Sequence, residues 1–249
     1  MPRVITPTEY QIRLRPDIAA ASFSGSVTIA ATADQAVSEI VLNAIELDIH
    51  SAVVRQSGAE HVAAITLDEA TERLHLQLDG AVAPGELEID IMFDGILNDK
   101  LRGFYRSSFT DDDGVEHTIA TTQFESTNAR RCFPCWDEPD RKAVFDVTLE
   151  VPQDMLAVSA MTETARTDLG DGWVQVAYAP TPLMSTYLLA FMVGDMEASP
   201  AIDVDGVPVR IIHRPGQGDQ ISFAHDAAVF CLRWLTNYFG VPYFGDKID

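Results

Sequence analysis

The chain has 249 residues, of which 47% are apolar and 22% are charged, and its net charge is −21. This composition is typical of a globular protein with a sizeable core and excludes a disordered chain. Because so acidic a surface repels phosphate backbones and anionic lipids, we expect neither nucleic acid nor a membrane as a partner.

Cysteine content and hydropathy indicate the compartment. Three cysteines are too few for a disulfide scaffold in a chain of this length. The first residues lack the basic and then apolar segments of a secretory signal. The longest apolar run near the end, 187–193, is far shorter than the roughly 18–20 residues that cross a bilayer. We therefore predict a soluble, cytoplasmic protein.

Strand patterns dominate the first two hundred residues. Apolar side chains at every second position predict half-buried strands, because successive side chains of a strand point to opposite faces. Four such sets are Ile12 and Leu14; Leu74, Leu76 and Leu78; Leu87, Ile89, Ile91 and Phe93; and Phe145, Val147, Leu149 and Val151. Turns are predicted at Asp79-Gly80, Gly170-Asp171-Gly172 and Asp205-Gly206, and a solvated hairpin tip at Asp111-Asp112-Asp113-Gly114. Many short strands with little helix favour an antiparallel β-sandwich or saddle.

Helical signals are confined to two places. Ser126 or Thr127 is predicted to cap a single helical turn that ends before Pro134. Residues 207–212 read as one last strand. Residues 221–239 then place apolar side chains three and four positions apart, which predicts a helix that ends at Gly240. We therefore expect a β domain over residues 1–205 and the start of a second domain over residues 206–249.

No catalytic or metal-binding motif is present. The six histidines are scattered, with no two four positions apart, and there is no nucleophile elbow, phosphate-binding loop or dinucleotide fingerprint. Cys132 and Cys135 have C-x-x-C spacing, but a zinc site needs about four ligands and no second pair completes one. We interpret these cysteines as structural and predict no catalytic residue and no metal ligand in this chain.

Three segments resemble the aminopeptidase N (membrane alanyl aminopeptidase) family of zinc metallopeptidases, in the gluzincin clan. Residues 121–143 read TTQFESTNARRCFPCWDEPDRKA and are similar to the signature T-Q-F-E-x-x-x-A-R-x-x-F-P-C-x-D-E-P-x-x-K-A. Residues 181–191, TPLMSTYLLAF, are similar to a T-P-x-M-S-T-Y-L-L-A-F strand of the family, and residues 103–107 are similar to G-F-Y-R-S. The segments keep the family's order, and the resemblance extends over essentially the whole chain.

The resemblance implies an architecture and a reaction. The fold would be a saddle-like antiparallel β-sandwich, followed by the first strand and helix of a truncated thermolysin-like α+β domain. The parent protein would be a zinc aminopeptidase that removes N-terminal residues from peptides. The zinc-binding motif would lie beyond residue 249, so this segment would bind no zinc and be inactive alone. Its partners would be peptides with a free N-terminus and its own catalytic domain, which is missing here.

Two substrate-binding residues carry over from the family pattern. Glu125 matches the acid of T-Q-x-E, which binds the α-amino group of the substrate; the alternative is that Glu125 pairs with Arg130 or Arg131 within the turn. Gln123 matches a position that lines the pocket for the first substrate side chain, and the alternative is a structural amide. Asp137 and Glu138 could suggest acid–base chemistry, but we interpret them as structural.

Two other functional classes are considered. The parent protein could be a relative that lost catalysis and serves as a scaffold, although the retained T-Q-F-E pattern argues against this. The chain could also be a free-standing β-sandwich binding module, although the apolar stripe of the predicted helix argues against that. We assign no chemistry to residues 184–191, which we interpret as a buried strand.

Overall fold

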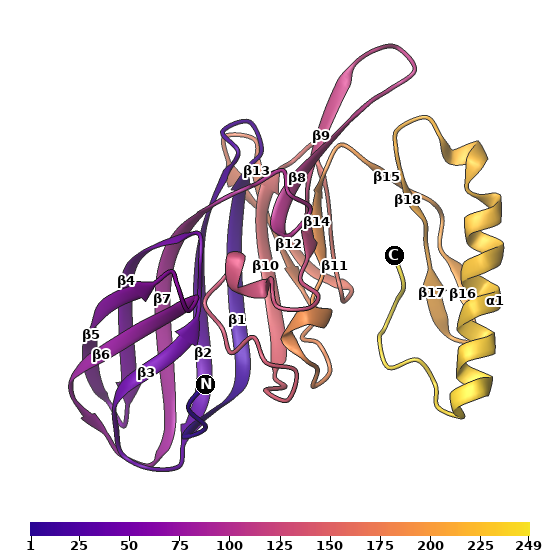
Figure 1. The fold of residues 1–249 in the computed structure, drawn as a ribbon. Coiled ribbons are helices and arrows are strands. Elements are labelled where there is room, and N and C mark those ends of the chain that lie inside the picture. The colour runs from indigo at the N-terminus through magenta and orange to yellow at the C-terminus, as the bar shows by residue number, and fades with distance from the viewer.

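The computed structural model describes all 249 residues and has one large sheet at its centre. Its ten strands follow the order β12-β13-β10-β1-β2-β7-β4-β5-β6-β3 (Figure 1). Neighbouring strands are antiparallel except β1 and β10, which run parallel with Glu9 opposite Val144. The strands are β1 (Ile5–Asp17), β2 (Ser22–Ala33), β3 (Val37–Asn43), β4 (Leu47–Gln56), β5 (Ala59–Asp68), β6 (Arg73–Val82), β7 (Gly85–Ile96), β10 (Val144–Pro152), β12 (Glu163–Gly170) and β13 (Trp173–Tyr178).

A second sheet of four strands has the order β11-β14-β9-β8. Its strands are β11 (Leu156–Ser159), β14 (Phe191–Gly194), β9 (Glu116–Gln123) and β8 (Gly103–Thr110). Two short ladders and a helix complete the chain, on the right of Figure 1. They comprise β15 (Glu197–Ala198) with β18 (Ile212–His213), β16 (Ile202–Val204) with β17 (Val207–Val209), and α1 (Ser222–Phe239); the 3₁₀ turns are η1 (Ala129–Arg131), η2 (Thr186–Leu188) and η3 (Gly218–Gln220).

The main core lies between the two larger sheets. It is one cluster of 47 buried residues, and it includes every member of the four alternating sets named above. Aromatic rings connect the sheets: Phe23 of β2 lies 5.2 Å from Phe104 of β8, which lies 5.2 Å from Phe191 of β14. The predicted mostly β fold with large antiparallel sheets is confirmed.

Two of the predicted turns and the hairpin tip are confirmed, and one turn is wrong. Residues 171–172 connect β12 to β13, residues 205–206 connect β16 to β17, and residues 111–114 form the tip of the β8–β9 hairpin. Asp79-Gly80 instead lies within β6. The pairing of β6 with β3 shifts there, from Val82 opposite Val37 to Gln77 opposite Glu39. The glycine therefore marks an irregularity inside a strand, which is a common position for glycine.

Three other local predictions also need correction. Residues 207–212 are not one strand, because β17 ends at Val209 and β18 pairs with a different partner. The residue before η1 is Asn128 and not Ser126 or Thr127, and its side chain makes no capping hydrogen bond. Residues 184–191 are mostly not a strand, since β14 begins only at Phe191. The hydroxyls of Ser185 and Thr186 instead donate to the carbonyls of Pro139 and Trp136, at 2.6 and 3.2 Å.

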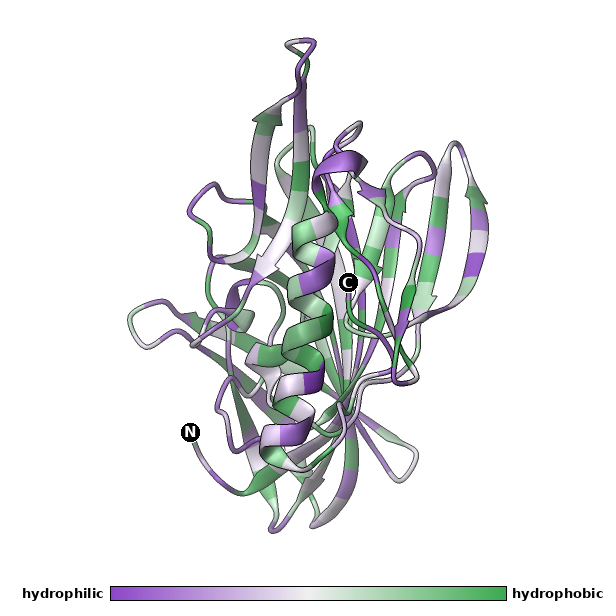
Figure 2. Ribbon diagram, turned by 90° about the vertical axis from the view of Figure 1, so that its right-hand side faces the viewer, coloured by the Kyte–Doolittle hydropathy of each residue, from purple (hydrophilic) through white to green (hydrophobic).

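The helix α1 belongs to a second, smaller core. Val204 of β16 and Val209 of β17 pack with Leu232 of α1, so the strands on both sides of residue 205 belong to this cluster. The helix ends as predicted at Gly240, which has φ 69° and donates to the carbonyl of Thr236 at 2.9 Å. Figure 2 shows α1 at the front with apolar bands on its outer side. No helix combines the length and the apolar character needed to cross a bilayer.

Candidate functional site

Gln123 and Glu125 lie at the C-terminal end of β9, on either side of a buried phenylalanine. Phe124 is 2% exposed, and its ring centroid lies 6.0 Å from those of Phe133 and Phe191. Because Phe124 points into the core, the side chains before and after it point outward, and both are exposed. The structure also brings the two predicted residues together, since Gln123 Nε2 donates to the backbone carbonyl of Glu125 at 3.4 Å. The peptide bond between Glu125 and Ser126 is cis.

The carboxylate of Glu125 makes no hydrogen bond and no ion pair within the chain. The alternative that it pairs with Arg130 or Arg131 is wrong, because both guanidinium groups are held elsewhere. Arg130 donates to Asp137 and Glu72 at 3.0 and 2.9 Å. Arg131 lies 2.7 Å from Glu46 and donates to Glu72 at 3.2 Å. Glu125 is therefore an unneutralised carboxylate on the surface, available to a cationic group.

Gln123 presents a more equivocal geometry. Its amide donates to the carbonyl of Glu125, which is the contact expected of a structural amide, but the bond is long at 3.4 Å. The exposed side chain retains an acceptor oxygen and a second N–H that point away from the core. The position thus agrees with either role.

Asp137 and Glu138 are held in ion pairs, in agreement with a structural role. The Asp137 side chain is 2% exposed, and its backbone N–H donates to the side chain of Asn43 at 3.2 Å. Burial raises the pKa of the Asp137 carboxyl, and the hydrogen bond from Arg130 opposes that shift. Glu138 accepts from the amino group of Met1 at 3.2 Å. Both carboxylates are therefore engaged within the chain.

The C-x-x-C cysteines are fully buried and unpaired. Cys132 and Cys135 are each 0% exposed, and burial raises the pKa of both thiols well above the ordinary value. A thiol held in its protonated form is a poor nucleophile and a poor metal ligand. No group of three or more His, Cys, Asp or Glu side chains is arranged to hold a metal ion.

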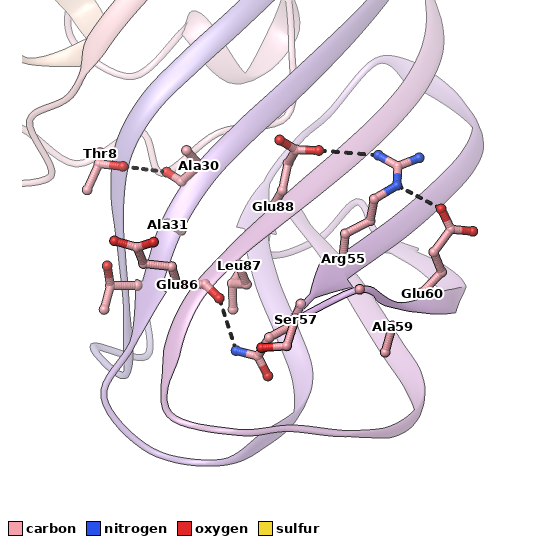
Figure 3. Close-up of a pocket in the computed structure, with 13 residues that line it drawn as sticks. Thr8, Ala30, Ala31, Arg55, Ser57, Ala59, Glu60, Glu86, Leu87 and Glu88 are labelled. Carbon is pink, nitrogen blue, oxygen red and sulfur yellow. Dashed lines mark hydrogen bonds and ion pairs between the residues drawn. The ribbon is translucent and has the colours of Figure 1, made fainter.

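Two hollows of the surface are lined by strands of the two larger sheets. A cavity of about 670 Å³ opens on β1, β2, β4 and β7, and Figure 3 shows Arg55 between Glu60 and Glu88 in it. Arg55 donates to these carboxylates at 2.9 and 3.3 Å, which neutralises part of their charge. A second cavity, of about 300 Å³, adjoins β9 at Thr121 and Thr122 and is also lined by residues of the C-terminal segment. Neither cavity is lined by Gln123 or Glu125.

The sequence does not reveal the residues that hold this site. Glu46 and Glu72 bind Arg130 and Arg131, yet they lie in turns 58 to 85 positions away from these arginines along the chain. Both have positive φ, 60° and 54°, which is uncommon for a residue other than glycine. No local pattern predicts this conformation at a glutamate, so only the tertiary structure identifies the cluster.

A sequence profile of the peptidase M1 N-terminal domain matches residues 6–188. The chain belongs to this family. It is 39% identical to an aminopeptidase M1-C of Oryza sativa subsp. japonica, over all of this chain and 28% of that protein. It is 39% identical to a puromycin-sensitive aminopeptidase of Caenorhabditis elegans and to an aminopeptidase M1 of Arabidopsis thaliana, over all of this chain and 27% and 29% of those proteins. The chain thus spans less than a third of the length of these relatives.

Proposed function

We propose that this chain is the N-terminal part of a zinc-dependent aminopeptidase and that Glu125 binds the α-ammonium group of the peptide substrate. The observation that carries the proposal is the exposed carboxylate of Glu125, which stays unpaired because Arg130 and Arg131, nearby in the sequence, pair with other carboxylates. A carboxylate accepts a charge-assisted hydrogen bond from an ammonium group, which stabilises a complex by about 1.5–3 kcal/mol. The names of the relatives support the substrate class.

The proposed role of Glu125 is to position the substrate. An anchor on the α-ammonium sets the distance from the peptide's first residue to the bond that is cut, so that single residues are removed. Gln123, on the same outer side of Phe124, would lie beside the first substrate side chain. These two residues hold and orient the substrate, and neither is proposed to break a bond.

Zinc enters the proposal only through the resemblance of residues 103–107, 121–143 and 181–191 to the family of zinc aminopeptidases. The residues of this chain do not fit a zinc site, since no three candidate ligands converge. The ligands would then lie in the remainder of a longer polypeptide, in a thermolysin-like domain of which residues 206–249 form the start. On this proposal the 249-residue chain has no peptidase activity by itself, and the protein acts in the cytoplasm.

A substitution of Glu125 in the full-length enzyme tests the proposal. Glu125→Gln keeps the size of the side chain and removes its charge, so kcat/KM for an unblocked aminoacyl anilide should fall about ten- to hundred-fold. The matched control is Glu116→Gln, which changes an exposed glutamate at the other end of the same strand. Equal kcat/KM values for wild type and Glu125→Gln would overturn the anchor. A full-length protein without activity would favour the scaffold alternative.

A further inference from the structure

The backbone of Glu125 is held by the side chain of Asn128, three positions further along the chain. Asn128 Nδ2 donates to the carbonyl of Glu125 at 3.2 Å, and the backbone N–H of Asn128 donates to the carbonyl of Phe124 at 2.8 Å. Asn128 therefore closes the loop that follows β9 by binding the carbonyls of two successive residues, Phe124 and Glu125. The contact leaves the carboxylate of Glu125 untouched.

Arg131 in turn fixes the orientation of Asn128. Its Nε donates to Asn128 Oδ1 at 3.3 Å, so the amide oxygen faces Arg131 and the amide nitrogen faces Glu125. Arg131 is 9% exposed and is itself held by Glu46 and Glu72. A buried guanidinium with two carboxylate partners has few alternative conformations, which makes it a rigid support.

The charges of the supporting cluster are balanced. It contains three guanidinium groups and three carboxylates, from Arg102, Arg130, Arg131, Glu46, Glu72 and Asp137. Because each arginine already has a carboxylate partner, none is left to neutralise Glu125. Arg131, which is close to Glu125 in sequence, thus supports the backbone of Glu125 through Asn128 and does not neutralise its carboxylate.

We propose that Asn128 and Arg131 are positioning residues, which hold the backbone of Glu125 so that its carboxylate points at the substrate's α-ammonium group. This inference rests on the proposed function of Glu125. Neither residue touches the substrate: Asn128 acts through the Glu125 carbonyl, and Arg131 acts through Asn128. A displaced anchor weakens binding of the amino terminus and leaves the reacting groups unchanged, so the effect falls on KM.

The test uses steady-state kinetics of the full-length enzyme with an unblocked aminoacyl anilide. Asn128→Asp keeps an oxygen that accepts from Arg131 but removes the N–H that donates to Glu125, and Asn128→Ala removes both contacts. We expect each variant to raise KM about tenfold, with kcat within about twofold and a melting temperature close to that of wild type. If one of the two variants fails to fold, the other still tests the inference.

A double substitution separates a positioning effect from a general structural one. If Asn128 acts through Glu125, Asn128→Asp has no further effect on KM in the Glu125→Gln background. If Asn128→Asp raises KM in the Glu125→Gln background as much as it does in the wild-type enzyme, the inference is overturned. An unchanged KM in both Asn128 variants would also overturn it. If Glu125→Gln itself leaves KM unchanged, the proposed anchor fails first, so the two failures are distinguishable.

Discussion

A Cβ placed on Gly103 would lie 2.7 Å from the Cβ of Arg131. The first residue of β8 thus lies directly against the arginine that supports Asn128 and Glu125. Gly103 also has φ 69°, a conformation that other residues rarely adopt. The glycine that begins the G-F-Y-R-S segment therefore leaves space for Arg131 of the A-R-R segment.

Gly103→Ala should therefore destabilise the fold and disturb the site. Because the new methyl group would crowd Arg131 and alanine is strained in a left-handed backbone, we expect the free energy of unfolding to fall by about 2–4 kcal/mol. Urea unfolding monitored by tryptophan fluorescence measures it. Gly114→Ala is the matched control, because φ there is 82° but nothing lies within 4 Å of the new methyl group. If the two variants lose the same free energy, the contact with Arg131 does not determine the need for glycine.

Tyr10 is expected to stabilise the protein through its hydroxyl group. The hydroxyl oxygen accepts from the buried backbone N–H of Trp136 at 3.1 Å, across 126 positions of the chain. Tyr10→Phe leaves that N–H without a partner, so we expect a loss of about 1–3 kcal/mol in chemical unfolding. Tyr178→Phe is the control, since the buried hydroxyl of Tyr178 has no partner and its removal should be neutral or stabilising. The reverse ranking of the two variants would contradict this account.

The stability contributed by His117 should decrease as the pH rises. Its ring nitrogens lie 2.8 Å from Asp111 and 2.7 Å from Asp195, and only an imidazolium can donate to both carboxylates. The hydrogen bond to Asp111, opposed by burial and reinforced by Asp195, raises the pKa of His117 above its ordinary value of 6.5. The stabilisation is thus complete below pH 6.5 and is lost as the pH rises through the folded-state pKa.

Thermal melts of wild type and His117→Gln between pH 5.5 and pH 8.5 test this pH dependence. We expect the difference in melting temperature to be larger at the acidic end of the range. His50→Gln is the control: its ring pairs with one carboxylate, Asp94, so it does not require a doubly donating imidazolium. A difference for His117→Gln that does not change with pH would show that folding leaves the pKa of His117 unchanged.

The cysteines should differ in their reactivity with a thiol reagent. Cys231 is exposed on α1, whereas burial shields Cys132 and Cys135 and raises the pKa of both thiols. We expect one thiol to react rapidly in the native protein and all three to react after denaturation. Mass spectrometry of the labelled chain identifies the site, and Cys231→Ser should abolish the rapid phase. Rapid labelling at Cys132 would indicate that the loop between β9 and β10 opens.

The sequence by itself determined the local features of this protein. The alternation of apolar residues at Leu87, Ile89, Ile91 and Phe93 predicts a strand because side-chain direction follows the backbone, and the end of α1 follows from a glycine at residue 240. The family resemblance likewise rests on contiguous motifs. Predictions failed where a contact overrode a local signal, as when Ser185 and Thr186 bind distant carbonyls and prevent a strand.

Only the tertiary structure decided which charges are neutralised. Arg130 and Arg131 are close to Glu125 in sequence, yet they pair with Glu72, 58 and 59 positions away. The choice depends on the turns that carry Glu46 and Glu72 and on the burial of Phe124, which turns Glu125 outward. The physical reason is that backbone propensities act over a few residues, whereas ion pairs are selected by which side chains the packed sheets bring within 4 Å of one another.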